Sequence, residues 1–503
     1  MKATDWFTPY EATEAARKLT ARARDEGLFY DVRSDSDLTK LRDEVRRLAG
    51  DMDNPEVDPP MLWSGIPVPP VSGSLTCDFH LVISIGGTNT VFGLYRLEDG
   101  VLLGLDLETG NEVRDVDALK RVRQAGTMPT PAFSDEVPTG REMMRRIVER
   151  FAELLGERSE SILERCEGVL LSWGFAHRIV RTAPDLVGGL SGRAMPMTKK
   201  QQGFDVDLLG QDIDQFFLEA LESRLGWKGP LAVANDTVMA LHYFLTEEWR
   251  SQTYRQGLFI NGTGSNFSMA EPYAVSERGY IADESDENRP DRLTPDRALG
   301  SGETAVEFFV NYETGSTRMG LTETRFDDER AYPYERNTIA GGRAFPKQFR
   351  AFTEAFQSPE LFERLRAALG HDPSAREVGY VCGTDGSSAA VAKVFPGVSL
   401  SNDEAQAVWF IARLVAQRSA QHLGQLLAAV SLRTGFGRGG NGLPDLVAME
   451  GRVWRVPFYP ELVEDWWAAL AGDPGIHVVF AHEPVYNASL PGPLYLAALH
   501  RRS

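Results

Sequence analysis

Asp236 is the side chain that its sequence context best suits to accept a proton. It follows the apolar run Leu231-Ala232-Val233-Ala234 and Asn235, and the residues after it favour a helix. A carboxylate between a strand and a helix is kept ionised by the positive end of the helix dipole. Such a group can act as a general base on a hydroxyl. The position equally fits a plain helix cap, in which case Asp236 would have no chemical role.

Two glycine-threonine turns could bind phosphate groups near such a base. One is Gly86-Gly87-Thr88-Asn89 and the other is Gly262-Thr263-Gly264, and each lies between two apolar segments. Each stretch predicts a β-hairpin whose turn brings backbone N–H groups against a ligand. If the two hairpins face each other, their turns form a nest for a polyphosphate. With Asp236 nearby, the expected chemistry is phosphoryl transfer to a hydroxyl.

Composition limits the classes of partner. The chain has 503 residues and a formal net charge of −19, which argues against nucleic acid or an anionic membrane as the main partner. No apolar run is long enough to span a bilayer, and the first residues do not resemble a secretory signal. Three scattered cysteines fit neither a disulfide framework nor a zinc site. We expect a cytoplasmic protein, and the composition does not indicate its oligomeric state.

Strands and helices alternate along the chain, which favours an α/β fold with open sheets and ligands at strand ends. Besides the two hairpins, we expect strands at 168–173, 231–234 and 446–449. We expect helices at 8–24, 37–48, 140–155, 201–226, 238–244, 403–430 and 493–500.

The ordered series of segments resembles the hexokinases, which share a superfamily fold with actin and the Hsp70 ATPase domain. Gly86-Gly87-Thr88-Asn89 resembles the first phosphate motif, and Gly262-Thr263-Gly264-Ser265-Asn266 resembles the second hairpin, with Glu271 where the family has a Glu. Ser172-Trp173-Gly174 and Met197-Thr198-Lys199 resemble the sugar-loop segments of the family, and Val233-Ala234-Asn235-Asp236-Thr237 resembles the segment that holds its catalytic Asp. Val447-Ala448-Met449-Glu450-Gly451 resembles the second phosphate motif. The segments around Glu313, around Glu335 and at Arg418-Ser419-Ala420 also resemble family segments.

The resemblance implies an α/β chain with two ribonuclease H-like lobes around a deep cleft, as in actin-like ATPases and sugar kinases. Residues 74–230 would form the small lobe and 235–480 the large lobe. Residues 1–73 would pack on the large lobe as N-terminal helices and a connector, and 481–503 would return to the small lobe as a C-terminal helix.

The resemblance also implies the roles of individual residues. Asp236 would be the general base, and Lys199 would stabilise developing negative charge. A hexose or related sugar would contact Ser172, Thr198, Lys199, Asn235, Asp236, Asn266, Glu313 and Glu335. A nucleoside triphosphate, with ATP expected, would contact Gly86, Gly87, Thr88, Asn89, Gly262, Thr263, Gly264, Gly451 and Arg452. Mg²⁺ would be held through phosphates and water rather than by direct side-chain ligation.

Several of these residues have a simpler interpretation. Glu313 and Glu335 could be surface carboxylates, unless their segments fold over the cleft. Lys199 beside Lys200 could be part of a solvated basic pair.

Departures from the family pattern concentrate in the half expected to hold the nucleotide. Ser84 stands where the family has an Asp, and Val91 stands where it has an Arg. Asp-Gly-Ser is replaced by Glu450-Gly451-Arg452, and Arg452 could either grip a phosphate or block its approach. The glycine-rich adenosine segment of the family has no clear equivalent.

Three functions therefore remain open. The first is an active hexokinase-like sugar kinase, and the second is a catalytically weak sugar-binding sensor or regulator. The third is an ATPase of the actin or Hsp70 type. The paired sugar-loop segments at Ser172 and at Thr198-Lys199 count against the third.

Overall fold

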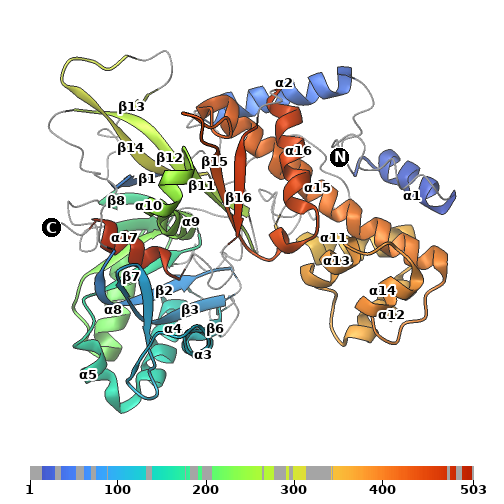
Figure 1. Ribbon diagram of the computed structural model, residues 1–503. Coiled ribbons are helices and arrows are strands. Elements are labelled where there is room, and N and C mark those ends of the chain that lie inside the picture. The colour runs from blue at the N-terminus through green and yellow to red at the C-terminus, as the bar shows by residue number, and fades with distance from the viewer. Residues whose placement is uncertain are drawn as a thin grey trace.

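The computed structural model describes residues 14–28, 35–52, 62–69, 75–87, 89–131, 139–175, 177–181, 191–194, 207–262, 265–276, 291–293, 298–312, 341–342, 344–472, 476–482 and 490–500. These residues form two seven-stranded mixed sheets with helices, which lie side by side in Figure 1.

The first sheet carries the first predicted hairpin. Its strand order is β10-β7-β2-β3-β4-β5, and β6 pairs with β3. Strands β2, β7 and β10 are parallel, so their carboxyl ends meet at one edge, whereas β2 and β3 form the antiparallel hairpin. The bounds are β2 Cys77–Ile85, β3 Asn89–Glu98, β4 Val101–Leu105, β5 Glu112–Val113, β6 Thr127–Pro129, β7 Gly168–Trp173 and β10 Leu231–Asn235.

Helices pack on this sheet through a core of aliphatic and aromatic side chains. Helix α4 (Gly140–Leu155) places Ile147 and Phe151 in that core, and α8 (Ile213–Leu225) adds Phe217. Thr139 caps α4 by accepting a hydrogen bond from the Glu142 N–H, which explains why the helix begins where the sequence predicts. The other helical elements here are α3 Val116–Ala125, η3 Gly156–Arg158 and α5 Ser159–Leu163.

The second sheet carries the second predicted hairpin. Its order is β1-β14-β12-β11-β15-β16, and β13 pairs with β12. Strands β11 and β12 form the antiparallel hairpin, and β15 lies parallel to β11 on its other side. The bounds are β1 Leu62–Pro67, β11 Gln256–Asn261, β12 Ser265–Ser276, β13 Asp291–Arg292, β14 Glu303–Tyr312, β15 Asp445–Glu450 and β16 Val478–His482.

Helix α15 (Asn402–Thr434) is the long, buried helix that the apolar periodicity predicts. A capping box from Ser401 to Glu404 starts it, and Gly435, with φ +73°, ends it. It packs against α16 and also contacts α2, α11 and α13. The helical elements of this half are α1 Glu14–Asp25, α2 Asp35–Asp51, α10 Glu247–Gln252, α11 Ala344–Phe356, α12 Pro359–Leu369, α13 Ala375–Cys382, α14 Ser388–Val394, η7 Val453–Arg455 and α16 Tyr459–Ala471.

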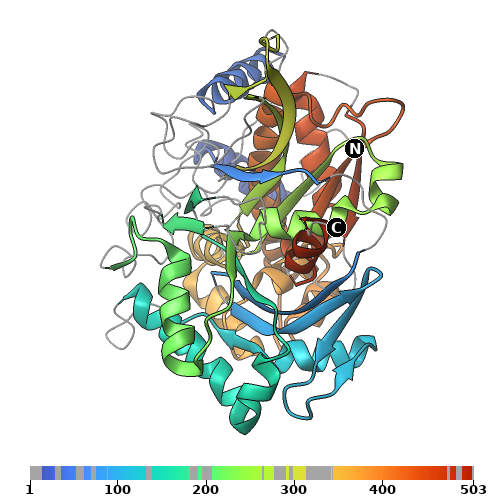
Figure 2. The same ribbon diagram turned by 90° about the vertical axis from the view of Figure 1, so that its left-hand side faces the viewer.

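Two short helices join the halves. Helix α9 (Asp236–Leu241) contacts β7 and β10 of the first sheet and β11, β12 and β14 of the second. Helix α17 (Gly492–His500) packs on α9 and on β2, β3 and β7. Both lie between the two sheets in Figure 1 and in the turned view of Figure 2. The segment η4 (His242–Leu245) follows α9 directly and contacts both helices. A two-stranded sheet of β8 (His177–Arg181) and β9 (Ser191–Ala194) contacts β1, α8 and β10.

Most predicted elements are confirmed within one to four residues at each end. The helix expected at 201–226 is shorter, because 208–211 form turns and bends and α8 begins only at Ile213. The capping box expected at residues 8–11 lies outside the described residues. The lobe boundaries stay a prediction. No helix in the described segments combines the length and apolar composition that a membrane span requires.

Candidate active site

Asp236 is the first residue of α9, directly after the fully buried strand β10. The helix cap is Asn235, whose side chain accepts a hydrogen bond from the Thr237 N–H at 2.9 Å. The alternative that Asp236 is merely the cap is therefore wrong. Its carboxylate is half-buried, and Oδ1 accepts a hydrogen bond from the Thr237 N–H at 2.8 Å. This position at a helix N-terminus favours the ionised form that a general base needs.

Polar side chains from the parallel strands lie around this point. Ser84 on β2 and Ala234 on β10 both pair with Ser172 on β7, so Ser172 lies near the same carboxyl edge as Asp236. Ser172 and Asn235 are both buried. Within the described part of the chain, neither Ser172 Oγ nor Asn235 Nδ2 has a hydrogen-bond partner. Buried polar atoms are costly without partners, so both are suited to a ligand that brings hydroxyl groups.

The first glycine turn lies directly beside Asp236. Ile85 and Thr90 form the last strand pair of the β2–β3 hairpin, and the Gly86 N–H donates to the Asn89 carbonyl at 3.0 Å. Gly174 touches both groups. A Cβ added to Gly174 would lie 3.3 Å from the Gly86 Cα and 3.0 Å from Asp236 Oδ2. Gly174 therefore lies between this turn and the carboxylate.

The second glycine turn meets the second predicted phosphate segment. Gly262 follows the Asn261–Ser265 strand pair of β11 and β12. Gly451, with φ +113°, approaches so closely that an added Cβ would lie 2.1 Å from the Asn261 carbonyl oxygen and 3.0 Å from the Gly262 nitrogen. Only glycine fits that position. Arg452, which follows, has an exposed side chain.

A buried polar network connects the second hairpin to the residues that flank Asp236. The Asn266 amide donates to Asn235 Oδ1 at 3.4 Å and to Thr237 Oγ1 at 3.3 Å. The Ser268 hydroxyl donates to Thr237 Oγ1 at 2.7 Å, and the Thr237 hydroxyl lies 3.2 Å from Asn311 Oδ1. Strands β12 and β14 are thereby hydrogen-bonded to the start of α9. The same residues that flank Asp236 therefore also position the second hairpin.

Glu271 does not belong to the site. It is fully buried on β12, and its Oε2 lies 2.8 Å from Arg292 Nε and 3.3 Å from Arg433 Nη2. It also accepts a hydrogen bond from the Tyr312 hydroxyl. Its carboxylate therefore links β12 to β13, β14 and α15.

The structure thus brings together part of the predicted site. The predicted residues that it describes near Asp236 are Ser172, Asn235, Asn266 and Gly86. Gly87 and Asn89 belong to the same turn as Gly86, and Gly262, Gly451 and Arg452 lie at the second turn. Seven predicted residues lie outside the described ranges, namely Thr88, Thr198, Lys199, Thr263, Gly264, Glu313 and Glu335.

Thr130 is a residue that the sequence analysis missed. Its hydroxyl donates to the Gly86 carbonyl at 2.7 Å, so it fixes the first glycine turn from the far side of β3. No local pattern marks this threonine, because its role depends on the pairing of β6 with β3. The sequence likewise does not mark the hydroxyls of Thr237 and Ser268, because their roles also depend on contacts between elements that are distant in the chain.

The comparisons with known proteins were informative at the level of structure. No protein-family model and no curated protein sequence matches the chain. A hexokinase from Schistosoma mansoni complexed with glucose matches with a TM-score of 0.63 and 15% identity, over 96% of this chain and 99% of that one. Another hexokinase structure matches with a TM-score of 0.59 and 17% identity, with the same coverage. The chain therefore has the two-lobed hexokinase fold, and the predicted fold class is confirmed.

Proposed function

We propose that this chain is a hexokinase-like sugar kinase, which transfers the terminal phosphoryl group of a nucleoside triphosphate to a hydroxyl of a hexose or related sugar. The observation that carries the proposal is the Asp236 carboxylate beside Gly86, with the unpartnered polar atoms of Ser172 and Asn235 around it. A base next to a phosphate-binding turn is the arrangement that phosphoryl transfer to a hydroxyl requires.

In this mechanism Asp236 accepts the proton of the attacking hydroxyl as charge develops on its oxygen. Ser172, Asn235 and Asn266 hydrogen-bond the sugar hydroxyls and orient the attacking one. Thr198, Lys199, Glu313 and Glu335 complete the sugar site by resemblance, and Lys199 stabilises negative charge. Buried polar groups of this kind reject analogues that lack a hydroxyl, because their own hydrogen bonds would then be unmade.

The nucleotide phosphates would lie between the two glycine turns. Gly86 and Gly87 with Thr88 and Asn89 form one side, and Gly262 with Thr263 and Gly264 forms the other, beside Gly451 and Arg452. Backbone N–H groups without side chains can approach phosphate oxygens closely. ATP is the donor that we propose to test first.

Mg²⁺ fits this arrangement as a companion of the phosphates. The described residues contain no cluster of three or more His, Cys, Asp or Glu side chains that could hold a metal. Mg²⁺ commonly keeps several waters and binds through substrate phosphates, and there it neutralises developing charge. Ser84 and Asp236 are two oxygen-bearing side chains near the first turn that could contact its water shell.

A second function is favoured by two residues in the donor half, by which we mean the part of the chain expected to hold the nucleotide. Ser84 adds no negative charge near the cation, and the exposed Arg452 stands where the family has a small Ser. A protein of this kind could bind sugar and act as a sensor with little turnover.

Calorimetry with a panel of hexoses, with and without Mg-ATP, separates these functions. A kinase binds both ligands and releases ADP only when sugar is present. Sugar binding without nucleotide binding would support the sensor. Nucleotide hydrolysis that no sugar changes would contradict both and favour an ATPase. Location in the cytoplasm stays a prediction.

A further inference from the structure

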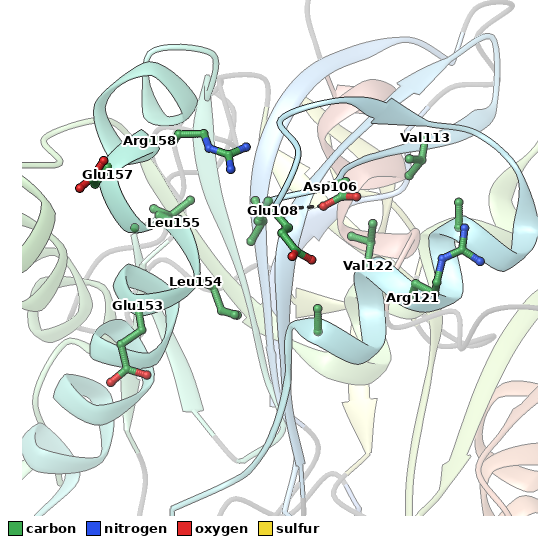
Figure 3. A pocket seen from close by; sticks show the side chains of 14 residues that line it. Asp106, Glu108, Val113, Arg121, Val122, Glu153, Leu154, Leu155, Glu157 and Arg158 are labelled. Atoms are coloured by element: carbon green, nitrogen blue, oxygen red, sulfur yellow. Dashed lines mark hydrogen bonds between the residues drawn. The ribbon is translucent and has the colours of Figure 1, made fainter.

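A cavity lies in the first half of the molecule, and Asp236 is not among its lining residues. It has a volume of about 640 Å³, which is within the usual range for small-molecule sites. One wall is the end of α4 with Leu154 and Leu155, and the other is α3 with Val122 and Ala125. Figure 3 shows the Glu108 side chain in the opening, between Leu154 and Val122.

The charges around this cavity favour a cation. Of the four carboxylates in its lining, Glu153 is paired with Arg150 at 3.0 Å. Figure 3 shows Glu157 directed away from the cavity, which leaves Asp106 and Glu108 beside Arg158. The Asp106 carboxylate is occupied by its own turn. Although burial opposes its ionisation, hydrogen bonds from the Glu108 and Thr109 N–H groups, with nearby Arg158, hold the pKa of Asp106 below its ordinary value.

Glu108 differs from Asp106 in this respect. Among the described residues, its side chain has no ion pair or hydrogen-bond partner. A ligand with an apolar body between Leu154 and Val122 and a positive group at Glu108 would match both the apolar walls and the Glu108 carboxylate at the opening.

The cavity is connected to the first glycine turn through three successive contacts. Helix α3 ends at Gly126, which is pressed against β3: an added Cβ would lie 1.8 Å from the Phe92 carbonyl oxygen. The Phe92 N–H donates back to the Gly126 carbonyl at 2.9 Å. Strand β6 follows and pairs with β3 from Asn89 to Val91. Thr130 then donates to the Gly86 carbonyl at 2.7 Å.

We propose that this cavity binds a small organic amine with an apolar body, and that its occupancy alters the first glycine turn through α3, β6 and Thr130. A ligand that separates α3 from the end of α4 moves Val122 and Ala125, and the next residue, Gly126, is hydrogen-bonded to Phe92 on β3. The coupling to nucleotide binding rests on the proposed function, whereas amine binding does not.

The test uses three probes with one phenyl body and different charges: phenethylamine, phenylpropionate and phenylethanol. Calorimetry on the full chain should show phenethylamine binding at least tenfold more tightly than the other two. Ala125→Trp fills the cavity from an exposed position and should weaken amine binding at least tenfold. Gln124→Trp, at the neighbouring exposed position outside the cavity, should leave it unchanged.

Hydrogen exchange measures the coupling between the cavity and the first glycine turn, and it requires no nucleotide. Saturating phenethylamine should change the exchange rate of the Gly86 and Phe92 amides at least threefold, and Thr130→Val should abolish the change at Gly86 but not amine binding. Equal binding of all three probes, or full binding to Ala125→Trp, would overturn the site. Binding with unchanged exchange at both amides would overturn the coupling. If the amine binds and alters exchange while ATP does not bind at all, only the proposed kinase function fails.

Discussion

Gly174 lies against Asp236: a methyl group on Gly174 would be 3.0 Å from Asp236 Oδ2 and 2.6 Å from the Ile85 carbonyl oxygen. The second of these contacts is with backbone and cannot yield, so a side chain at 174 must shift either the β7 end or the carboxylate. The absence of a side chain at one residue therefore sets the position of the proposed base at another.

Gly174→Ala should consequently lower kcat. Displacement of a catalytic group by about 1 Å can cost on the order of a hundredfold in rate, so we expect a loss of that size with the sugar Kd changed much less. Steady-state kinetics and calorimetry measure the two effects. Gly50→Ala is the control, because an added Cβ there meets nothing within 4 Å. A Gly174→Ala enzyme with wild-type kcat would show that the carboxylate needs no fixed position.

Asp236→Ala should reduce turnover by several orders of magnitude, because no other group would accept the hydroxyl proton. Sugar affinity should change far less, since the proposed sugar contacts of Ser172, Asn235 and Asn266 would remain. Coupled assays and calorimetry on the same preparations give both quantities. A parallel loss of turnover and affinity would instead make Asp236 a binding or structural residue.

Ser84→Asp tests the donor half. Ser84 is half-buried on β2 beside Ser172, and the family has an Asp at this position. A carboxylate there should attract hydrated Mg²⁺, so the Mg²⁺ concentration that gives half-maximal activity should fall several-fold. Ser84→Asn is the control of the same size without the charge. If both variants respond to Mg²⁺ alike, negative charge at residue 84 is not what limits the donor half.

Thr237→Val should destabilise the protein. Thr237 is fully buried, and its hydroxyl meets Asn235, Ser268, Asn266 and Asn311 at the junction of the two sheets. Removing it leaves several buried polar groups without a partner, at a cost of about 1–3 kcal/mol in the free energy of unfolding.

The matched control is Thr353→Val, at another fully buried threonine. Its hydroxyl donates only within α11, to the Phe349 carbonyl at 2.7 Å. That helix carbonyl retains its backbone partner, so we expect a loss of about 1 kcal/mol or less. Urea denaturation compares the two. Equal losses would mean that the network around Thr237 adds nothing to the stability of the junction.

Acidification should weaken the fold through two histidines, the buried His177 and the half-buried His500. Burial lowers the pKa of His177 to about 4, and burial together with the charge of Arg250 lowers that of His500 to about 4. Because both pKa values are depressed in the folded state, the unfolded chain binds more protons below about pH 6.5. Stability is therefore complete above that pH and falls as the pH approaches 4, by about 2 kcal/mol per histidine between pH 6.5 and pH 5.

Urea denaturation of His500→Gln at about pH 7.5 and about pH 5 checks this expectation. The variant should lose less stability on acidification than the wild type, by about 2 kcal/mol. His371→Gln, at an exposed ring, should retain the wild-type loss. An unchanged pH dependence in His500→Gln would contradict a contribution from His500.

Local patterns predicted the elements of the site well. The apolar runs on either side of Gly86 and Gly262 gave two hairpins, because strand alternation and glycine turns are properties of neighbouring residues. The change from strand to helix at Asp236 was likewise predictable from the sequence, but the residue that caps the helix was not. Asn235 and Asp236 both suit a cap, and the choice depends on which side chain the folded strand directs at the Thr237 N–H.

By itself, the sequence determined where the hairpins, the strand before Asp236 and the long helix Asn402–Thr434 form, since propensity and periodicity act between residues close in the chain. Only the tertiary structure decided that Gly174 limits the Asp236 carboxylate, that Thr130 holds Gly86, and that Thr237 joins the two sheets. These contacts follow from the order β10-β7-β2-β3 and from the packing of α9 between both sheets. Many residues separate most of these partners in the chain, so no local pattern could specify their contacts.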